Sequence, residues 1–206
     1  MTRNIGIYIF DEVEVLDFAG PFEVFNTASR VSQRILPLLP PPFNTFTIGF
    51  GAAEIKTRGG LRVQPHYSIQ NHPPLDVLIV PGGVVTEVLN SDPLISWIQK
   101  CAAGTEVTAS VCTGAFLLAK AGLVDGQTVT THWEDLSDLS KMFPKVKTQS
   151  GVRWIDNGKI ITSAGISAGL DMSLHLVEKL ENKNLALKTA RQMDYAWIDK
   201  IEENVE

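Results

Sequence analysis

The stretch TASVCTGAFLLAKAG, residues 108–122, indicates the fold class more clearly than any other part of the chain. Its first residues favour a buried strand, and the residues after the cysteine are good helix formers that end at a glycine. Cys112 therefore lies at a sharp turn between a predicted strand and a predicted helix. Such strand–turn–helix units build α/β proteins with a parallel sheet.

The segments on either side continue this alternation. We expect strands at residues 5–10, 43–50, 75–80, 106–111 and 127–132, and a hairpin at 152–165 that turns at Asp156-Asn157-Gly158. We expect helices at residues 18–30, with Pro21 near the start, at 93–104, 113–122 and 169–183, and a helical stretch from about Leu185. The pattern predicts an α/β fold with a doubly wound, mainly parallel sheet flanked by helices. Because no repeat or linker divides the chain, we expect a single domain over residues 1–206.

The composition narrows the class of protein. The 206 residues are 44% hydrophobic and 20% charged, which suits a compact domain with a large core. The net charge of −5, without a cluster of Lys or Arg, argues against a nucleic-acid partner. The first apolar run is too short for a signal peptide, and no stretch reaches the roughly 18 apolar residues of a membrane span. Two cysteines make no disulfide framework, so we expect a soluble, cytoplasmic protein with free thiols and no membrane partner.

Ligands of parallel sheets bind beyond the carboxyl ends of the strands. Four segments deliver unusual residues to that edge: Asp17, the pair Gly82-Gly83, Cys112 and His132. We therefore expect a small-molecule site there.

Cys112 has two interpretations, a buried structural residue or a nucleophile. Its place before a helix favours a thiolate, because amide groups and the helix dipole lower the thiol pKa. Ser110 and Gly114 are small enough to permit the tight turn of a nucleophile elbow. We therefore expect a nucleophile at Cys112, whereas the mid-helix Cys101 is expected to be structural.

A thiolate nucleophile needs groups that handle protons and negative charge. The backbone amides of Gly83 and Thr113 can form an oxyanion hole, although Gly82-Gly83 is equally compatible with a plain turn. Asp17 either caps the helix that follows or is a desolvated acid with a raised pKa. Both alternatives stay open for each site.

His132 closes the predicted strand at residues 127–132. It is either a partner of the cysteine or a satisfied hydrogen-bonding group. His66, His72 and His175 show no ligand spacing, so we expect no metal site.

Together these motifs resemble a known family. DVLIVPGG (76–83), SVCTGAFLLAKAGLVDGQTVTTHW (110–133) and GISAGLDMSLHLVEKL (165–180) are similar to the DJ-1/PfpI superfamily, which has a flavodoxin-like fold of the class I glutamine amidotransferase type. Within it, LDFAGPFEVF (16–25) followed by the C-T-G and TTHW motifs resembles the bacterial isocyanide hydratase subgroup. The resemblance extends from about Asn4 to Tyr195 and is weakest from Arg30 to Pro42.

The resemblance implies specific roles. Cys112 matches the elbow cysteine, Asp17 the acidic partner, and Gly83 and Thr113 the residues whose amides face the reacting atom. Amidase-like members carry a His directly after the cysteine, where this chain has Thr113, so an amidase is disfavoured. The implied activity is a lyase reaction that hydrates an isocyanide, R–N≡C, to an N-substituted formamide through a thioimidate on Cys112, without a cofactor.

Two other functions compete with this enzyme. Cys112 can serve a redox or ligand sensor by oxidation. The same fold also forms the ligand-binding half of AraC-type regulators, although the chain ends at Glu206 without the further helix-turn-helix residues such a regulator needs. The resemblance further implies a homodimer with each site close to the interface.

Overall fold

The computed structural model describes residues 1–199. Its centre is a seven-stranded sheet in which only one edge strand, β10, is antiparallel to its neighbour. In spatial order the strands are β10 (Trp154–Asp156), β11 (Ile160–Ser163), β7 (Val107–Val111), β6 (Val77–Val80), β1 (Arg3–Tyr8), β2 (Phe43–Gly49) and β5 (Tyr67–Ser68). This confirms the predicted α/β fold with a mainly parallel sheet.

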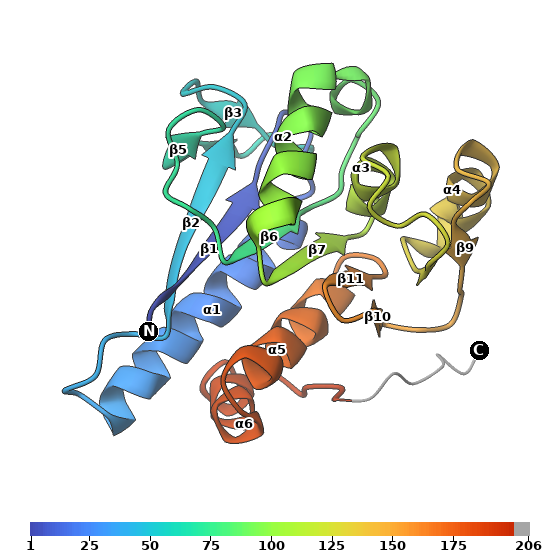
Figure 1. Ribbon diagram of the computed structural model, residues 1–206. Helices are drawn as coiled ribbons and strands as arrows, with labels where there is room; N and C mark the ends of the chain where they lie inside the picture. The colour runs from blue at the N-terminus through green and yellow to red at the C-terminus, as the bar shows by residue number, and fades with distance from the viewer. Residues whose placement is uncertain (200–206) are drawn as a thin grey trace.

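Helices cover both faces of the sheet (Figure 1). On one face α1, α5 and α6 pack against one another, and on the other face α2 packs against α3. The helices are α1 (Val15–Ile35), α2 (Asp92–Gly104), α3 (Gly114–Lys120), α4 (Leu136–Met142), α5 (Ala168–Leu180) and α6 (Lys183–Gln192), with the 3₁₀ turns η1 (Val88–Asn90) and η2 (Trp133–Asp135). The layers match the predicted doubly wound arrangement.

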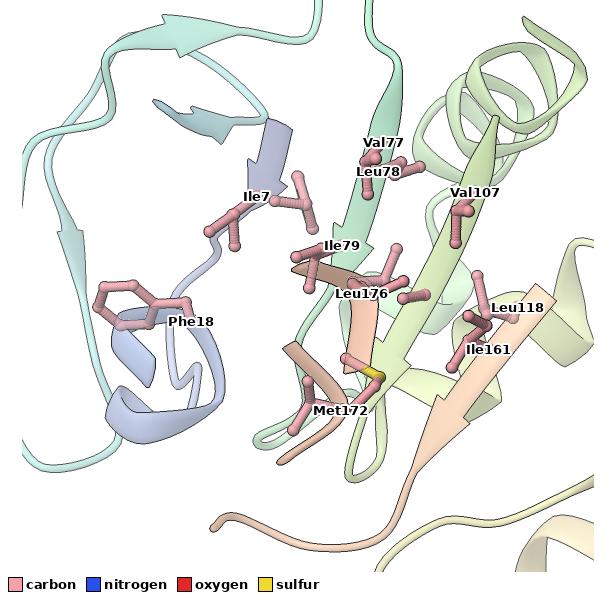
Figure 2. Packing of buried hydrophobic residues seen from close by; sticks show 14 of the residues in the cluster. Ile7, Phe18, Val77, Leu78, Ile79, Val107, Leu118, Ile161, Met172 and Leu176 are labelled. Atoms are coloured by element: carbon pink, nitrogen blue, oxygen red, sulfur yellow. The ribbon is translucent and has the colours of Figure 1, made fainter. Parts of the chain in front are cut away.

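The core is built by the apolar strands and the inner sides of the helices (Figure 2). Ile7, Ile79 and Val107 come from three adjacent strands, and Met172 and Leu176 of α5 pack over them. The central strands β6 and β7 are buried along their whole length, as expected for parallel strands that helices cover on both faces.

One predicted strand is wrong in extent and in partner. Of residues 127–132 only Thr128 and Val129 form a strand, β8 (Thr128–Val129), which pairs with β9 (Lys147–Thr148) outside the main sheet. Beyond β8, side-chain hydroxyls replace the ladder: the Thr130 amide donates to Oγ1 of Thr162, at 3.0 Å. The edge of the main sheet at this end is occupied by β10.

The first helix also begins earlier than predicted. It begins at Val15, so Pro21 lies inside the helix rather than near its start. The segment before it is held by the Glu14 amide, which donates to the Gly82 carbonyl at 2.9 Å. This tertiary contact fixes the helix start, and no local pattern marks it. The sequence also gave no indication of α4 or of the small hairpin of β3 (Ile55–Lys56) and β4 (Arg62–Val63).

Asp171 ties the end of the described chain to the core. This fully buried carboxylate pairs with Arg153 at 2.5 Å and accepts the Ile198 amide at 3.0 Å. Within residues 1–199, no helix is long and apolar enough to cross a membrane. The predicted domain extends over residues 1–206, of which 200–206 lie outside the described residues.

Candidate active site

Cys112 occupies the turn between β7 and α3, as predicted. Its backbone has a φ of 54°, a left-handed conformation that residues with a Cβ seldom adopt. Three hydrogen bonds hold it there: the Cys112 amide donates to the carbonyls of Ala164 (2.9 Å) and Ser163 (3.2 Å), and the Cys112 carbonyl accepts from Oγ1 of Thr131 (2.8 Å). The fixed elbow aims the side chain in one direction.

Gly114 makes this elbow possible. A Cβ at position 114 would overlap with the carbonyl oxygen of Val80, at the end of the neighbouring strand β6. Only glycine therefore allows α3 to begin so close to the sheet. The expectation that Gly114 permits a tight turn is confirmed by this contact.

Asp17 lies directly beside the elbow. It is the third residue of α1, is fully buried, and accepts the Gly82 amide through Oδ2 at 3.0 Å. The position before the helix belongs to Glu14, so Asp17 is not an N-cap. Of the two interpretations from the sequence, the desolvated acid is the correct one.

Burial raises the pKa of Asp17 from its ordinary value of 3.8 to about 7. Hydrogen bonds from the Gly82 amide and, more weakly, the Cys112 thiol oppose this rise. Oδ1 of Asp17 has no well-formed hydrogen bond to any of residues 1–199. A carboxyl group with one anchored oxygen and one free oxygen is suited to gaining and losing a proton near neutral pH.

Burial also raises the pKa of the Cys112 thiol, to about 12, and the charge of Asp17 adds to the rise. Hydrogen bonds from the amide and hydroxyl of Thr113 favour the thiolate but do not compensate. The expected low thiol pKa is therefore wrong for this site. The helix that follows, α3, has only seven residues, and its amides stabilise a thiolate less than the loss of water destabilises it.

The glycine turn after β6 packs against the elbow. Gly83 has a φ of 139°, and a Cβ there would overlap with the carbonyl oxygen of Glu12. Its amide donates to Oγ1 of Thr113 at 2.9 Å, and the same hydroxyl donates to the Gly83 carbonyl at 2.9 Å. The Gly83 amide is thus occupied by Thr113, and of the two amides expected to form the oxyanion hole the Thr113 amide is the one that interacts with the sulfur.

His132 lies near Cys112 but does not pair with it. Its Nδ1 is 3.6 Å from Oδ2 of Asp135 and 3.7 Å from Oε2 of Glu134, and its ring lies against the backbone of Gly165. Among the described residues no hydrogen bond joins its ring to the thiol. Of these two side chains, Asp17 is the one that contacts the Cys112 thiol.

A cavity of about 270 Å³ opens over the thiol. Cys112, Thr113, Gly83 and His132 line it, whereas Asp17 does not, so four of the five predicted site residues meet there. Its other walls are Glu14, Arg58, Val84, Glu134, Asp135 and Ile166. Sequence reasoning missed these residues. Glu14 and Asp135 each lie three positions from a predicted site residue, which is a usable clue, whereas Arg58 comes from the unpredicted β3–β4 hairpin.

The chain is similar in sequence to an enzyme and to a transcriptional regulator. It is 30% identical over 199 residues to the isonitrile hydratase of Pseudomonas putida, covering 95% of this chain and 80% of that protein. It is 28% identical over 196 residues to the HTH-type transcriptional regulator GbdR of Pseudomonas aeruginosa, covering 95% of this chain and 52% of the regulator, so it spans about half of the regulator's length.

Among solved structures, a ThiJ/PfpI family protein from Pseudomonas syringae shares the fold, with a TM-score of 0.82 at 23% identity over 95% of this chain and 76% of that one. Residues 3–179 match the DJ-1/PfpI family. The match extends from β1 to α5 and includes the elbow, the glycine turn and Asp17. The chain therefore belongs to the DJ-1/PfpI family.

Proposed function

We propose that the protein hydrates isocyanides to N-substituted formamides, with Cys112 as the nucleophile and Asp17 as the acid–base group. The observation that carries the proposal is the fully buried Asp17 in contact with a thiol that has no imidazole partner among the described residues, and burial raises the pKa of this carboxyl to about 7. The 30% identity to an isonitrile hydratase over nearly the whole chain supports it.

The reaction balances with these two groups and water. The carboxylate of Asp17 takes the thiol proton while sulfur attacks the terminal carbon of R–N≡C. Protonated Asp17 then delivers that proton to the same carbon, which gives the thioimidate R–N=CH–S–Cys112. Water adds to the carbon, the C–S bond breaks, and R–NH–CHO leaves with the thiol restored.

The turn around Gly83 favours this reaction over amide hydrolysis. Attack on an amide places negative charge on an oxygen, which needs two free donors. Here the Gly83 amide already donates to Thr113. Attack on an isocyanide develops charge on carbon and nitrogen instead, and a single proton donor serves it. We propose that Gly83, Thr113 and His132 shape the substrate cavity.

The test measures by chromatography how fast the parent protein and three variants convert p-tolyl isocyanide to its formamide. Asp17→Asn keeps the acceptor for the Gly82 amide but cannot exchange a proton, so turnover should fall by at least about 100-fold. Cys112→Ala should abolish turnover. The matched control is Cys101→Ala, in α2, which should stay within a few-fold of the parent because Ala is the better helix former. Hydration at the parental rate by Asp17→Asn would falsify the proposed role.

A second candidate is a ligand-sensing module, favoured by the 28% match to a transcriptional regulator. A sensor binds its ligand without turnover, so it predicts that isocyanides or formamides raise the melting temperature while no product forms. An oxidation sensor is less well supported, because the raised thiol pKa of Cys112 slows reaction with peroxide.

We also propose that the protein is a homodimer that works in the cytoplasm. Val84 and Ile166 are partly exposed at the cavity, and Trp133 beside them is 73% exposed. Exposed apolar side chains grouped at one place are typical of an interface. Two free thiols, one of them the nucleophile, suit a reducing compartment. Light scattering of the parent and of Trp133→Glu tests the dimer: the variant should be monomeric.

A further inference from the structure

The cavity over Cys112 adjoins a second, larger one. Gly83, Val84, Thr113 and Asp135 line both, so the two cavities are neighbours. The second cavity measures about 570 Å³ and is lined by residues of η1, α3 and α4. In Figure 1, α3 and α4 are the two short helices at the same side of the molecule. We call this second cavity the α3–α4 groove.

The two cavities differ in their share of aromatic and other large apolar side chains. Around the thiol most walls are charged or polar, from Glu14, Arg58 and Glu134 among others. The α3–α4 groove also has charged residues at its wall, Lys120, Asp135 and Asp138, but it adds the rings of Phe116 and Phe143, which stand edge to face with centroids 6.4 Å apart. Leu89, Val85 and Met142 complete the apolar walls. Its volume lies within the range of about 300–1,000 Å³ that small-molecule pockets occupy.

Met142 is the most informative wall residue. Its side chain is 54% exposed although it is one of the larger apolar residues. It ends α4, so it flanks the groove from the solvent side. A ligand in the groove would bury it, which stabilises the complex in proportion to the apolar area covered.

From these features we infer that the α3–α4 groove binds the substituent R of the substrate and selects for an uncharged aryl or arylalkyl group. A linear R–N≡C with its terminal carbon at the thiol projects R away from Cys112, and the groove adjoins the cavity over the thiol through four shared lining residues. This inference rests on the proposed function for the reacting group, but the selectivity of the groove is measurable at Cys112 without turnover.

Another large apolar cavity, of about 580 Å³, does not fit this role. Phe50, Ile55 and Leu94 line it, and the thiol does not. It shares Val84 with the cavity over Cys112 but neither of the elbow residues Cys112 and Thr113. It supplies a matched control residue, because Phe50 is 49% exposed, close to the value for Met142.

The first arm of the test measures alkylation of Cys112 in a Cys101→Ala background, by mass spectrometry at pH 9. N-benzyl and N-methyl iodoacetamide are compared, and glutathione gives their intrinsic rate ratio. The protein should prefer the benzyl reagent by at least about tenfold over glutathione, since a few apolar contacts are worth that much. Met142→Glu should remove most of the preference, Met142→Leu should keep it, and Phe50→Glu should leave it unchanged.

The second arm measures kcat/KM for benzyl and methyl isocyanide with the same variants. If neither isocyanide reacts but the alkylation pattern holds, the proposed function fails and the groove stands. No benzyl preference in alkylation, no reaction of Cys112 with the benzyl reagent, or equal effects of Met142→Glu and Phe50→Glu would overturn the groove. Melting temperatures within a few degrees of the parent confirm that the exposed substitutions spare the fold.

Discussion

Thr113 closes a small ring with Gly83, in which its Oγ1 accepts the Gly83 amide and donates to the Gly83 carbonyl, both at 2.9 Å. The hydroxyl thereby joins the turn after β6 to the elbow after β7. It also occupies the position where amidase-like relatives were expected to carry a histidine. Thr113 therefore stabilises the elbow from the position at which a histidine would favour an amidase.

Replacing Thr113 tests this ring. Thr113→Val keeps the shape but leaves both Gly83 groups without a partner, which should lower the free energy of unfolding by roughly 1–3 kcal/mol. Thr113→Ser retains the hydroxyl and should stay close to the parent. Urea unfolding of the three proteins measures the difference. Equal stability of the Val and Ser variants would show that the ring contributes nothing.

Asp17 should make stability depend on pH. Its pKa is about 7 in the folded state and 3.8 ordinarily, so between these values the folded state binds more protons than the unfolded state. The free energy of unfolding therefore falls as the pH rises through this window, by on the order of 3–4 kcal/mol from this group. Asp17→Asn lacks the titration, so the variant should gain stability over the parent between pH 4.5 and pH 8. A stability difference that is the same at both values would contradict the buried-acid assignment.

The thiol should be slow to react with small reagents. In a Cys101→Ala background, alkylation of Cys112 by iodoacetamide should keep rising above pH 9, because burial and the charge of Asp17 raise the thiol pKa to about 12. Asp17→Asn removes the negative charge and should move the alkylation profile to lower pH, while isocyanide turnover falls. A plateau near pH 7 in the parent would instead indicate a preformed thiolate.

Gly114 should not tolerate even alanine, whereas Gly104 at the end of α2 should tolerate it. Gly114→Ala forces a Cβ onto the Val80 carbonyl and should destabilise the protein by roughly 2–4 kcal/mol. The control is Gly104→Ala at the end of α2, where a Cβ meets nothing within 4 Å. Thermal melts should show a large fall for the first variant and little change for the second. If both variants melt like the parent, the close approach of α3 to β6 is not a constraint.

The sequence predicted those parts of the fold that local patterns specify. Buried apolar runs located β1, β2, β6 and β7, and Asp156-Asn157-Gly158 located the β10–β11 hairpin, whereas the short parallel strand β5 was not predicted. The predicted strand at residues 127–132 failed because hydroxyl contacts such as that of Thr130 with Thr162 replaced its ladder. Periodicity carries no information about such long-range contacts.

The candidate site likewise has residues that local sequence position predicts and residues that only long-range contacts bring to it. Position after a strand identified Cys112 and the glycine turn, because the carboxyl ends of parallel strands share one edge. The bond between Asp17 and the Gly82 amide, and the place of Arg58 at the cavity, depend on residues far apart in the chain. The expected direction of the Cys112 pKa shift was wrong because the sequence shows that a helix follows the cysteine but not how deeply the thiol is buried.

The left-handed backbone of Cys112, with its φ of 54°, means that the residue best for stability at this position is not the one that carries a thiol. A residue with a Cβ pays about 1–2 kcal/mol for that conformation, and glycine does not. Selection for heat resistance alone would therefore drive position 112 toward glycine, and a catalogue of stabilising substitutions would include the one that removes the thiol. A cysteine that persists there under such selection is retained for its sulfur.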